Sequence, residues 1–154
     1  MTDMDRADLL TAIRSAIASA PSAESAMKQA VRLLKDAIPY YSWVGIYLLD
    51  GDELELGPFL GKPSPHTRIP LGNGICGAAA TAKATIVVDD VNADPRYLAC
   101  SLETKSEIVV PIMEDGVVLG EIDIDSDTPA AFGDADRRLL EQVAALLAES
   151  LSED

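Results

Sequence analysis

The sequence predicts an α+β fold in which helices pack on a central antiparallel β-sheet and both termini are helical. Apolar residues recur at helical spacing in residues 1–38 and again in residues 132–151. Between these regions, residues 40–126 contain two pairs of strand-like segments. The chain has 154 residues, 48% of them apolar, which is the size of one domain with a substantial core.

Two helices are expected at the N-terminus and one at the C-terminus. The first covers residues 5–19 and ends before Pro21. Ser22 is a suitable N-cap for the second, which runs to about residue 38 and is closed by Pro39. The last helix covers residues 134–151. Their apolar faces are formed by Leu9, Leu10, Ile13 and Ile17, by Ala26, Ala30, Leu33, Leu34 and Ala37, and by Leu139, Leu140, Val143, Leu146 and Leu147.

Two β-hairpins are expected in the middle of the chain. Residues 42–49 and 53–59 form the first pair, and residues 107–112 and 117–125 form the second. An Asp-Gly dipeptide, the strongest short hairpin signal, stands between the strands of each pair. Shorter elements connect the hairpins: a loop at 61–66, an extended piece at 68–71, a helix at 75–82, a strand at 85–88, and a long loop at 92–106 with one helical turn near 94–96. A loop of that length in a compact domain is usually functional or mobile.

A glycine-rich segment at residues 72–77 matches the pattern G-x-G-x-x-G of dinucleotide-binding folds. We reject that interpretation because the strand before it would be residues 68–71, which is short and contains Arg68 and Pro70. A hairpin follows, where a dinucleotide-binding unit would continue with a further parallel strand. The glycines are better explained by a tight turn into a helix.

Composition and charge restrict the partners. The formal net charge of −14 would repel a phosphate backbone, so nucleic acid is excluded as a partner. The acidic N-terminus is unlike a signal peptide, and no apolar run is long enough to cross a membrane. Two cysteines are too few for a disulfide framework. We therefore expect a cytoplasmic protein with reduced thiols.

Several stretches are similar to the free methionine-(R)-sulfoxide reductases, a branch of the GAF family. The similarity covers residues 40–150 in unbroken order, and its most specific features are Cys100, seven residues before Glu107, and the Asp-Ile-Asp motif that begins at Asp123. The matching stretches are residues 56–62, 68–70, 74–77, 99–100, 106–111 and 122–126.

The resemblance implies a GAF-type fold, with helices on one side of the sheet and a ligand pocket roofed by loops on the other. It implies that Cys100 attacks the sulfoxide sulfur and becomes a sulfenic acid. A second cysteine then forms a disulfide, which thioredoxin or another external thiol reduces. No bound cofactor is expected, and a homodimer through the terminal helices is plausible. By position, the substrate-binding residues are Trp43, Glu107, Asp123 and Asp125.

The residue types suit this chemistry. The substrate is a small zwitterion whose ammonium group needs a carboxylate, and attack at sulfur places negative charge on the oxygen, which a protonated carboxyl can stabilise. Asp123 and Asp125 are two apart on a strand and share a face, and Glu107 begins a neighbouring strand. Crowding should raise at least one carboxyl pKa. The alternative for the two aspartates is a solvated sheet face.

The sequence departs from the family at His66, where a first cysteine usually stands and often resolves the sulfenic acid. Three outcomes are open: Cys76 resolves Cys100, an external thiol reduces Cys100 directly, or the chain is a non-catalytic GAF sensor that binds a small ligand. Cys76 is otherwise a small apolar residue packing a helix start, and His66 an exposed loop histidine. A further hypothesis is a metal site formed by His66, Cys76 and Cys100.

Overall fold

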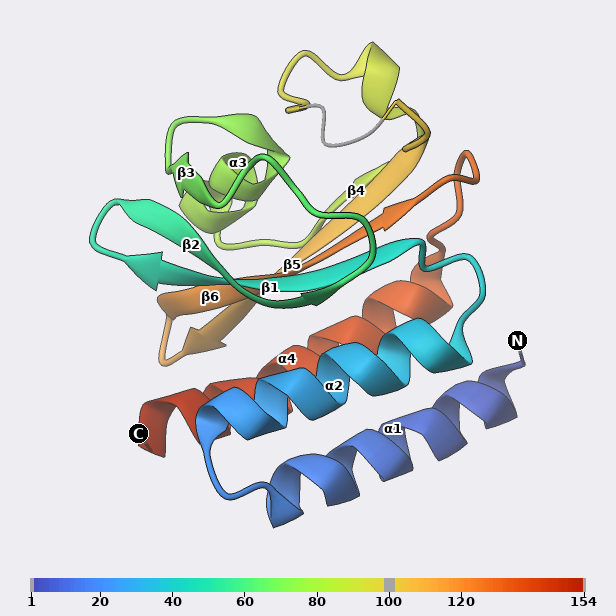
Figure 1. Cartoon of the computed structure of the whole chain (residues 1–154), viewed down its shortest axis with the longest axis vertical. Coiled ribbons are helices and arrows are strands. Elements are labelled where there is room, and N and C mark those ends of the chain that lie inside the picture. The colour runs from blue at the N-terminus through green and yellow to red at the C-terminus, as the bar shows by residue number, and fades with distance from the viewer. Residues whose placement is uncertain (1, 99–101, 154) are drawn as a thin grey trace.

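The computed structural model describes residues 2–98 and 102–153 (Figure 1). Its elements in chain order are α1 (Asp3–Ser19), α2 (Ala23–Ala37), β1 (Trp43–Asp50), β2 (Glu53–Leu60), β3 (Arg68–Pro70), α3 (Gly74–Ala82), β4 (Ile86–Val88), the 3-10 helix η1 (Val91–Ala93), β5 (Ser106–Glu114), β6 (Val117–Ser126) and α4 (Asp134–Glu153). The strands form one sheet in the order β3-β2-β1-β6-β5-β4, and every neighbouring pair is antiparallel. This confirms the α+β fold with helices at both ends.

The helices divide between the two faces of the sheet. Helices α2 and α4 lie against one face, and α1 packs on these two helices as an outer layer (Figure 1). Helix α3 and the loops on either side of it cover the opposite face. The sheet is therefore covered on both sides, which is why β5 and β6 are buried along most of their length.

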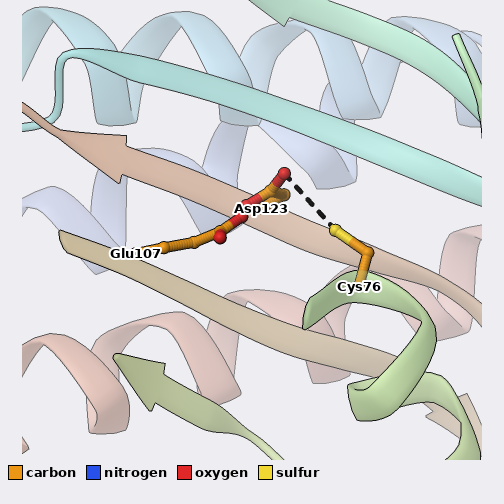
Figure 2. Close-up of side chains that lie close together, drawn as sticks. All are labelled: Cys76, Glu107 and Asp123. Atoms are coloured by element: carbon orange, nitrogen blue, oxygen red, sulfur yellow. Dashed lines mark hydrogen bonds between the residues drawn. The ribbon is translucent and has the colours of Figure 1, made fainter. Parts of the chain in front are cut away.

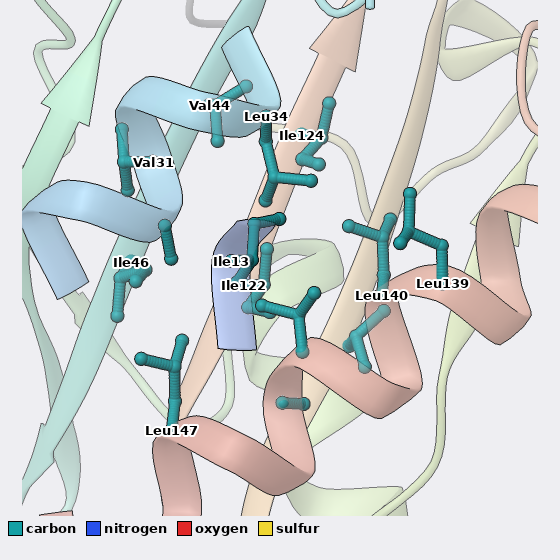
Figure 3. Packing of buried hydrophobic residues seen from close by; sticks show 14 of the residues in the cluster. Ile13, Val31, Leu34, Val44, Ile46, Ile122, Ile124, Leu139, Leu140 and Leu147 are labelled. Atoms are coloured by element: carbon teal, nitrogen blue, oxygen red, sulfur yellow. The ribbon is translucent and has the colours of Figure 1, made fainter. Parts of the chain in front are cut away.

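The larger core lies between the sheet and the three long helices (Figure 3). Thr2 caps α1 in a capping box with Asp5, and Ser22 caps α2 as predicted, by accepting from the Ser25 amide. The apolar faces then meet the sheet face that carries Ile122 and Ile124. The fully buried side chains at the centre include Ile13, Leu34, Val44, Ile46, Leu140 and Leu147.

Asp136 ties the first helix and the start of the sheet to α4. Its Oδ1 accepts hydrogen bonds from the hydroxyls of Tyr40 and Tyr41, both at 2.7 Å, and lies 3.5 Å from Arg6 Nη2. Its Oδ2 accepts from the Gly133 amide at 3.0 Å, which caps α4. Asp136 is 3% exposed. One buried carboxyl therefore connects α1, the segment before β1 and the start of α4.

The structure differs from the sequence prediction in the long connection before β5. In the described part of this connection the helical turn is η1, at residues 91–93, and not at 94–96. Asp90 caps it by accepting from the Asn92 amide. Asp94 instead accepts from the Arg96 amide and guanidinium, and this local turn is incompatible with a helix at Pro95. In the part of the chain that the structure describes, no helix has both the length and the apolar character needed to cross a membrane.

Candidate active site

Strand β6 carries a row of acidic side chains on the face that α3 covers. Glu121, Asp123 and Asp125 alternate with Ile122 and Ile124, and the period of a strand directs the two sets to opposite faces. The three acidic residues are 0%, 3% and 3% exposed. The structure therefore contradicts the alternative of a solvated face for the two aspartates.

Glu107 joins this row from the neighbouring strand. It pairs directly with Asp125 in the register of β5 and β6, and it is 6% exposed. Cross-strand neighbours in an antiparallel sheet share a face, so the two carboxyls lie side by side. We call Glu107, Glu121, Asp123 and Asp125 the carboxyl row.

Cys76 reaches the carboxyl row from helix α3. Its thiol donates to Asp123 Oδ2 at 3.4 Å, and the side chain is 4% exposed (Figure 2). The glycines of the G-x-G-x-x-G segment make this approach possible. Gly74 starts α3 with a φ of +73°, and a side chain at Gly77 would meet the Leu71 carbonyl oxygen at 2.5 Å. The segment thus allows α3 to pack closely against the sheet, as the tight-turn interpretation requires.

Burial and crowding raise the pKa values of the carboxyl row. Burial is the largest cause of the shift in each carboxyl. It raises the pKa of Glu107 and of Asp125 well above the ordinary range, and the charge of Asp123 raises both further. The pKa of Asp123 is also raised by burial, but hydrogen bonds with Glu107 and Cys76 oppose that rise. Asp123 is therefore the carboxyl of the row that ionises most readily, while burial favours the neutral forms of Glu107 and Asp125.

Several oxygens of the row are ready to bind a ligand. Asp123 Oδ1 and Asp125 Oδ1 are buried and have no hydrogen-bond partner. Unsatisfied buried acceptors of this kind are rare in folded proteins and usually have a functional explanation. A row that combines one favoured carboxylate with neutral carboxyls can bind a cation and donate hydrogen bonds at the same time.

Trp43 forms an apolar wall at the Asp125 end of the row. It pairs with Asp125 across β1 and β6, stacks on Phe59 with ring centroids 5.6 Å apart, and donates from Nε1 to the Lys62 carbonyl at 2.9 Å. Lys62 also forms an ion pair with Glu103. The indole is thus held between β2 and the loop after it, beside a hollow that Asp125 also lines.

Gly45 provides the space in which the Trp43 indole lies. A side-chain carbon at Gly45 would lie 2.3 Å from Trp43 Cη2. We expect Gly45→Ala to displace the indole from Phe59 and to lower the free energy of unfolding by about 1–3 kcal/mol. Trp43 is the single tryptophan, so its fluorescence emission should shift towards that of a solvated indole. Gly72→Ala is the control, because its methyl group would meet nothing within 4 Å. Equal emission spectra and equal stability for the two variants would contradict this account.

Cys100 lies outside the described residues, so the structure does not place the predicted attacking thiol. The residues on either side of it line the candidate site. Leu98 borders the hollow that contains Cys76 and Asp123, and Glu103 borders the hollow beside Trp43.

His66 is not the exposed loop residue that the sequence suggests. It is half-buried and lines the same hollow as Cys76, because its carbonyl accepts from the Tyr47 hydroxyl at 2.8 Å and its amide donates to Ser64 Oγ. The structure thus brings two of the three residues of the metal hypothesis to one hollow, and the third, Cys100, is not described. Ligand atoms of Cys76, Glu107 and Asp123 lie within 4.8 Å of one another, but a metal would have to displace protons that burial holds there.

Two residues of the site were missed by sequence reasoning. Glu121 extends the alternation of Asp123 and Asp125 by one step, so the period of the strand could have revealed it. Tyr47 lies opposite Glu121 on β1 and borders the same hollow as Cys76, and no motif marks it.

The fold agrees with comparisons to known proteins. The family model of the GAF domain matches residues 22–151, and the chain belongs to the GAF domain family. Within that family it is similar to proteins named free methionine-R-sulfoxide reductase, which are oxidoreductases. The Escherichia coli protein of that name is 34% identical over 95% of this chain and 88% of its own length. These findings confirm the resemblance identified from the sequence.

Two solved structures show the same similarity. The type II free methionine-R-sulfoxide reductase from Thermoplasma acidophilum is 43% identical, with a TM-score of 0.82 over 85% of this chain and 93% of that one. The enzyme from Neisseria meningitidis, solved in complex with its substrate, is 37% identical, with a TM-score of 0.92 over 99% of this chain and 92% of that one.

Proposed function

We propose that this protein reduces free L-methionine (R)-sulfoxide to methionine, with Cys100 as the attacking thiol and Cys76 as the resolving thiol. The observation that carries the proposal is the contact between the buried Cys76 thiol and the carboxyl row, at 3.4 Å from Asp123. Similarity to the Escherichia coli and Neisseria meningitidis proteins, which bear the name of this activity, supports it.

The carboxyl row suits the polar groups of this substrate. Its ammonium group pairs with Asp123, the carboxyl that ionises most readily. The neutral carboxyls of Glu107 and Asp125 donate hydrogen bonds to the sulfoxide oxygen, where negative charge develops. The Trp43 indole provides an apolar surface for the methyl group. A buried site admits a free amino acid more readily than a residue within a protein chain.

The first chemical step transfers the oxygen to a cysteine. The Cys100 thiolate attacks the sulfoxide sulfur, and the oxygen takes a proton from the neutral carboxyls. The oxygen then passes to the Cys100 sulfur as the bonds from the substrate sulfur to oxygen and to Cys100 break, and methionine departs. Cys100 is left as a sulfenic acid. The Cys100 sulfur is oxidised by two electrons and the sulfoxide sulfur is reduced by two. The proton donated by the carboxyls ends on the sulfenic oxygen.

The second step uses Cys76. Its sulfur attacks the sulfenic sulfur of Cys100, a sulfur–sulfur bond forms, and the sulfur–oxygen bond breaks. The departing hydroxide combines with the thiol proton of Cys76 and leaves as water. Thioredoxin, or another external dithiol, then reduces the disulfide and restores both thiols.

A coupled assay tests this function. Free L-methionine (R)-sulfoxide is supplied with thioredoxin, thioredoxin reductase and NADPH, and NADPH consumption is measured for wild type, Cys76→Ser and Cys100→Ser. We expect turnover by wild type and none by Cys100→Ser. Cys76→Ser should release one methionine per chain and consume no NADPH, because the sulfenic acid has no internal partner and no disulfide forms.

Other outcomes identify other functions. Sustained turnover by Cys76→Ser would assign resolution to the external thiol. A ligand-induced rise in melting temperature without any turnover by wild type would identify a non-catalytic GAF sensor and overturn the proposal.

A further inference from the structure

A thiol and two carboxyls from three different elements converge in the candidate site. Cys76 comes from α3, Glu107 from β5 and Asp123 from β6, and Figure 2 shows their side chains pointing toward one another. One ligand atom from each residue lies within 4.8 Å of the other two. All three side chains are buried, so the surrounding protein fixes their positions.

The separations within this cluster suit ligands that share one metal ion. Zinc binds cysteine sulfur at about 2.3 Å and carboxylate oxygen at about 2.0–2.2 Å, usually in a tetrahedron, which places a sulfur and an oxygen ligand about 3.5 Å apart. Cys76 Sγ and Asp123 Oδ2 are 3.4 Å apart. Glu107 supplies a third ligand, and the fourth position is open to a water or to His66, which lines the same hollow.

Two further observations point to a cation at this place. Asp123 Oδ1 is buried and has no hydrogen-bond partner, so the cluster contains an acceptor that a bound ion would satisfy. Cys76, Glu107 and Asp123 also line a hollow of about 20 Å³, which is enough for a single ion or water molecule. No Lys or Arg is among the described residues that line this hollow, so no cationic side chain there competes for the carboxyls.

The mixture of donor atoms selects the class of metal. Magnesium and calcium take oxygen ligands, and a buried thiol is foreign to the sites that hold them. Thiolate ligands favour zinc and metals of similar softness, and carboxylates are also common zinc ligands. The cluster therefore suits zinc better than the hard divalent cations.

We propose that Cys76, Glu107 and Asp123 bind one zinc ion, or a divalent metal of similar softness, and that the bound ion excludes the substrate. The ion takes the place of the thiol proton, which is released to solvent, as at other cysteine–zinc sites. While the ion is bound, Cys76 cannot attack a sulfenic acid and Asp123 cannot pair with the substrate ammonium. The metal site stands independently of the proposed function, and only the exclusion of substrate rests on it.

Cobalt(II) is the probe for this site, because it replaces zinc and its absorption spectrum reports its ligands. Reduced, metal-free protein is titrated with cobalt chloride, and zinc chloride is then added to displace the cobalt. Wild type should bind one Co²⁺ per chain, with the charge-transfer band of a cobalt–sulfur bond. Magnesium chloride should leave the spectrum unchanged. Absence of the band, or its loss with magnesium, would overturn the inference.

Variants of the two cysteines identify the sulfur ligand. Cys76→Ser should abolish the charge-transfer band, because serine provides no sulfur. Cys100→Ser is the matched control and should keep the band. A band that survives in Cys76→Ser, or that disappears in Cys100→Ser, would overturn the inference.

Variants of the carboxyls identify the oxygen ligands. Asp123→Asn and Glu107→Gln should each raise the Kd for Co²⁺ by at least about tenfold, since even the outer-shell partners of metal ligands contribute that much. Asp115→Asn and Glu114→Gln make the same changes at the turn between β5 and β6 and should leave the Kd unchanged. Equal Kd values for the site variants and their controls would contradict the proposed ligand set.

A measurement on the unaltered protein keeps the inference testable if a variant does not fold. X-ray absorption spectroscopy of zinc-loaded wild type should show one sulfur ligand at about 2.3 Å and lighter ligands at about 2.0–2.2 Å. Two sulfur ligands, or none, would overturn the inference.

Competition with substrate is measured in Cys100→Ser, which binds the sulfoxide without turnover. A rise in melting temperature first establishes that free L-methionine (R)-sulfoxide binds. The Kd for Co²⁺ should then increase in proportion to the sulfoxide concentration, and an unchanged Kd would overturn the exclusion of substrate. Metal binding by a wild-type protein that never reduces the sulfoxide would refute the proposed function alone. Turnover by a protein that binds no cobalt or zinc would refute this inference alone.

Discussion

Asp123→Asn is expected to lower kcat/KM for free L-methionine (R)-sulfoxide by at least about a hundredfold. Asparagine preserves the size of the side chain and removes the charge that we propose pairs with the substrate ammonium. The same charge accepts the hydrogen bond of the Cys76 thiol at 3.4 Å. Both binding and disulfide formation should therefore weaken, so KM should rise and kcat should fall together.

The matched control for this variant is Asp115→Asn, in the turn between β5 and β6. It makes the same chemical change on the same hairpin, at an exposed position with a φ of +51° that asparagine adopts readily. Its kcat/KM should stay within twofold of wild type. If Asp123→Asn retained wild-type kinetics, the charge at Asp123 would have no part in the reaction.

Asp136→Ala is expected to lower the free energy of unfolding by about 3–5 kcal/mol. The substitution removes the acceptor of the Tyr40 and Tyr41 hydroxyls and of the Gly133 amide, and leaves the Arg6 guanidinium without its ion-pair partner on α4. Urea unfolding followed by circular dichroism measures this loss, and an unchanged m-value would show that the denatured state is unaffected.

Asp134→Ala provides the comparison for Asp136→Ala. Asp134 is exposed in the first turn of the same helix, where its negative charge interacts favourably with the positive end of the helix dipole. We expect a loss of no more than about 1 kcal/mol there. Equal losses for the two variants would mean that the buried contacts of Asp136 contribute nothing beyond a favourable helix start.

The sequence was sufficient to predict the fold because the local signals agree with one another. Periodic apolar residues at both ends, Ser22 before α2 and an Asp-Gly turn in each hairpin all favour the same arrangement of elements. The helical turn in the long connection was misplaced by three residues. There the structure depends on which aspartate side chain, Asp90 or Asp94, caps the backbone, and composition does not distinguish them.

The site was harder to predict than the fold. Family resemblance indicated Glu107, Asp123 and Asp125, but their alternation with isoleucine equally fits a solvated strand face. Burial by α3 decides between the two interpretations, and that contact depends on tertiary packing at Gly77. Glu121 was overlooked because its alternation becomes informative only once the face is known to be buried. The half-buried position of His66 likewise follows from a backbone contact with Tyr47.

The most direct test of the reductase proposal is a single turnover without external reductant. Fully reduced wild-type protein is mixed with one equivalent of free L-methionine (R)-sulfoxide, and both methionine and the intact protein mass are measured. The proposed chemistry predicts one methionine per chain and a protein lighter by two hydrogen atoms, with peptide mapping joining Cys76 to Cys100. Recovery of unreacted sulfoxide and of protein with both thiols intact would contradict it.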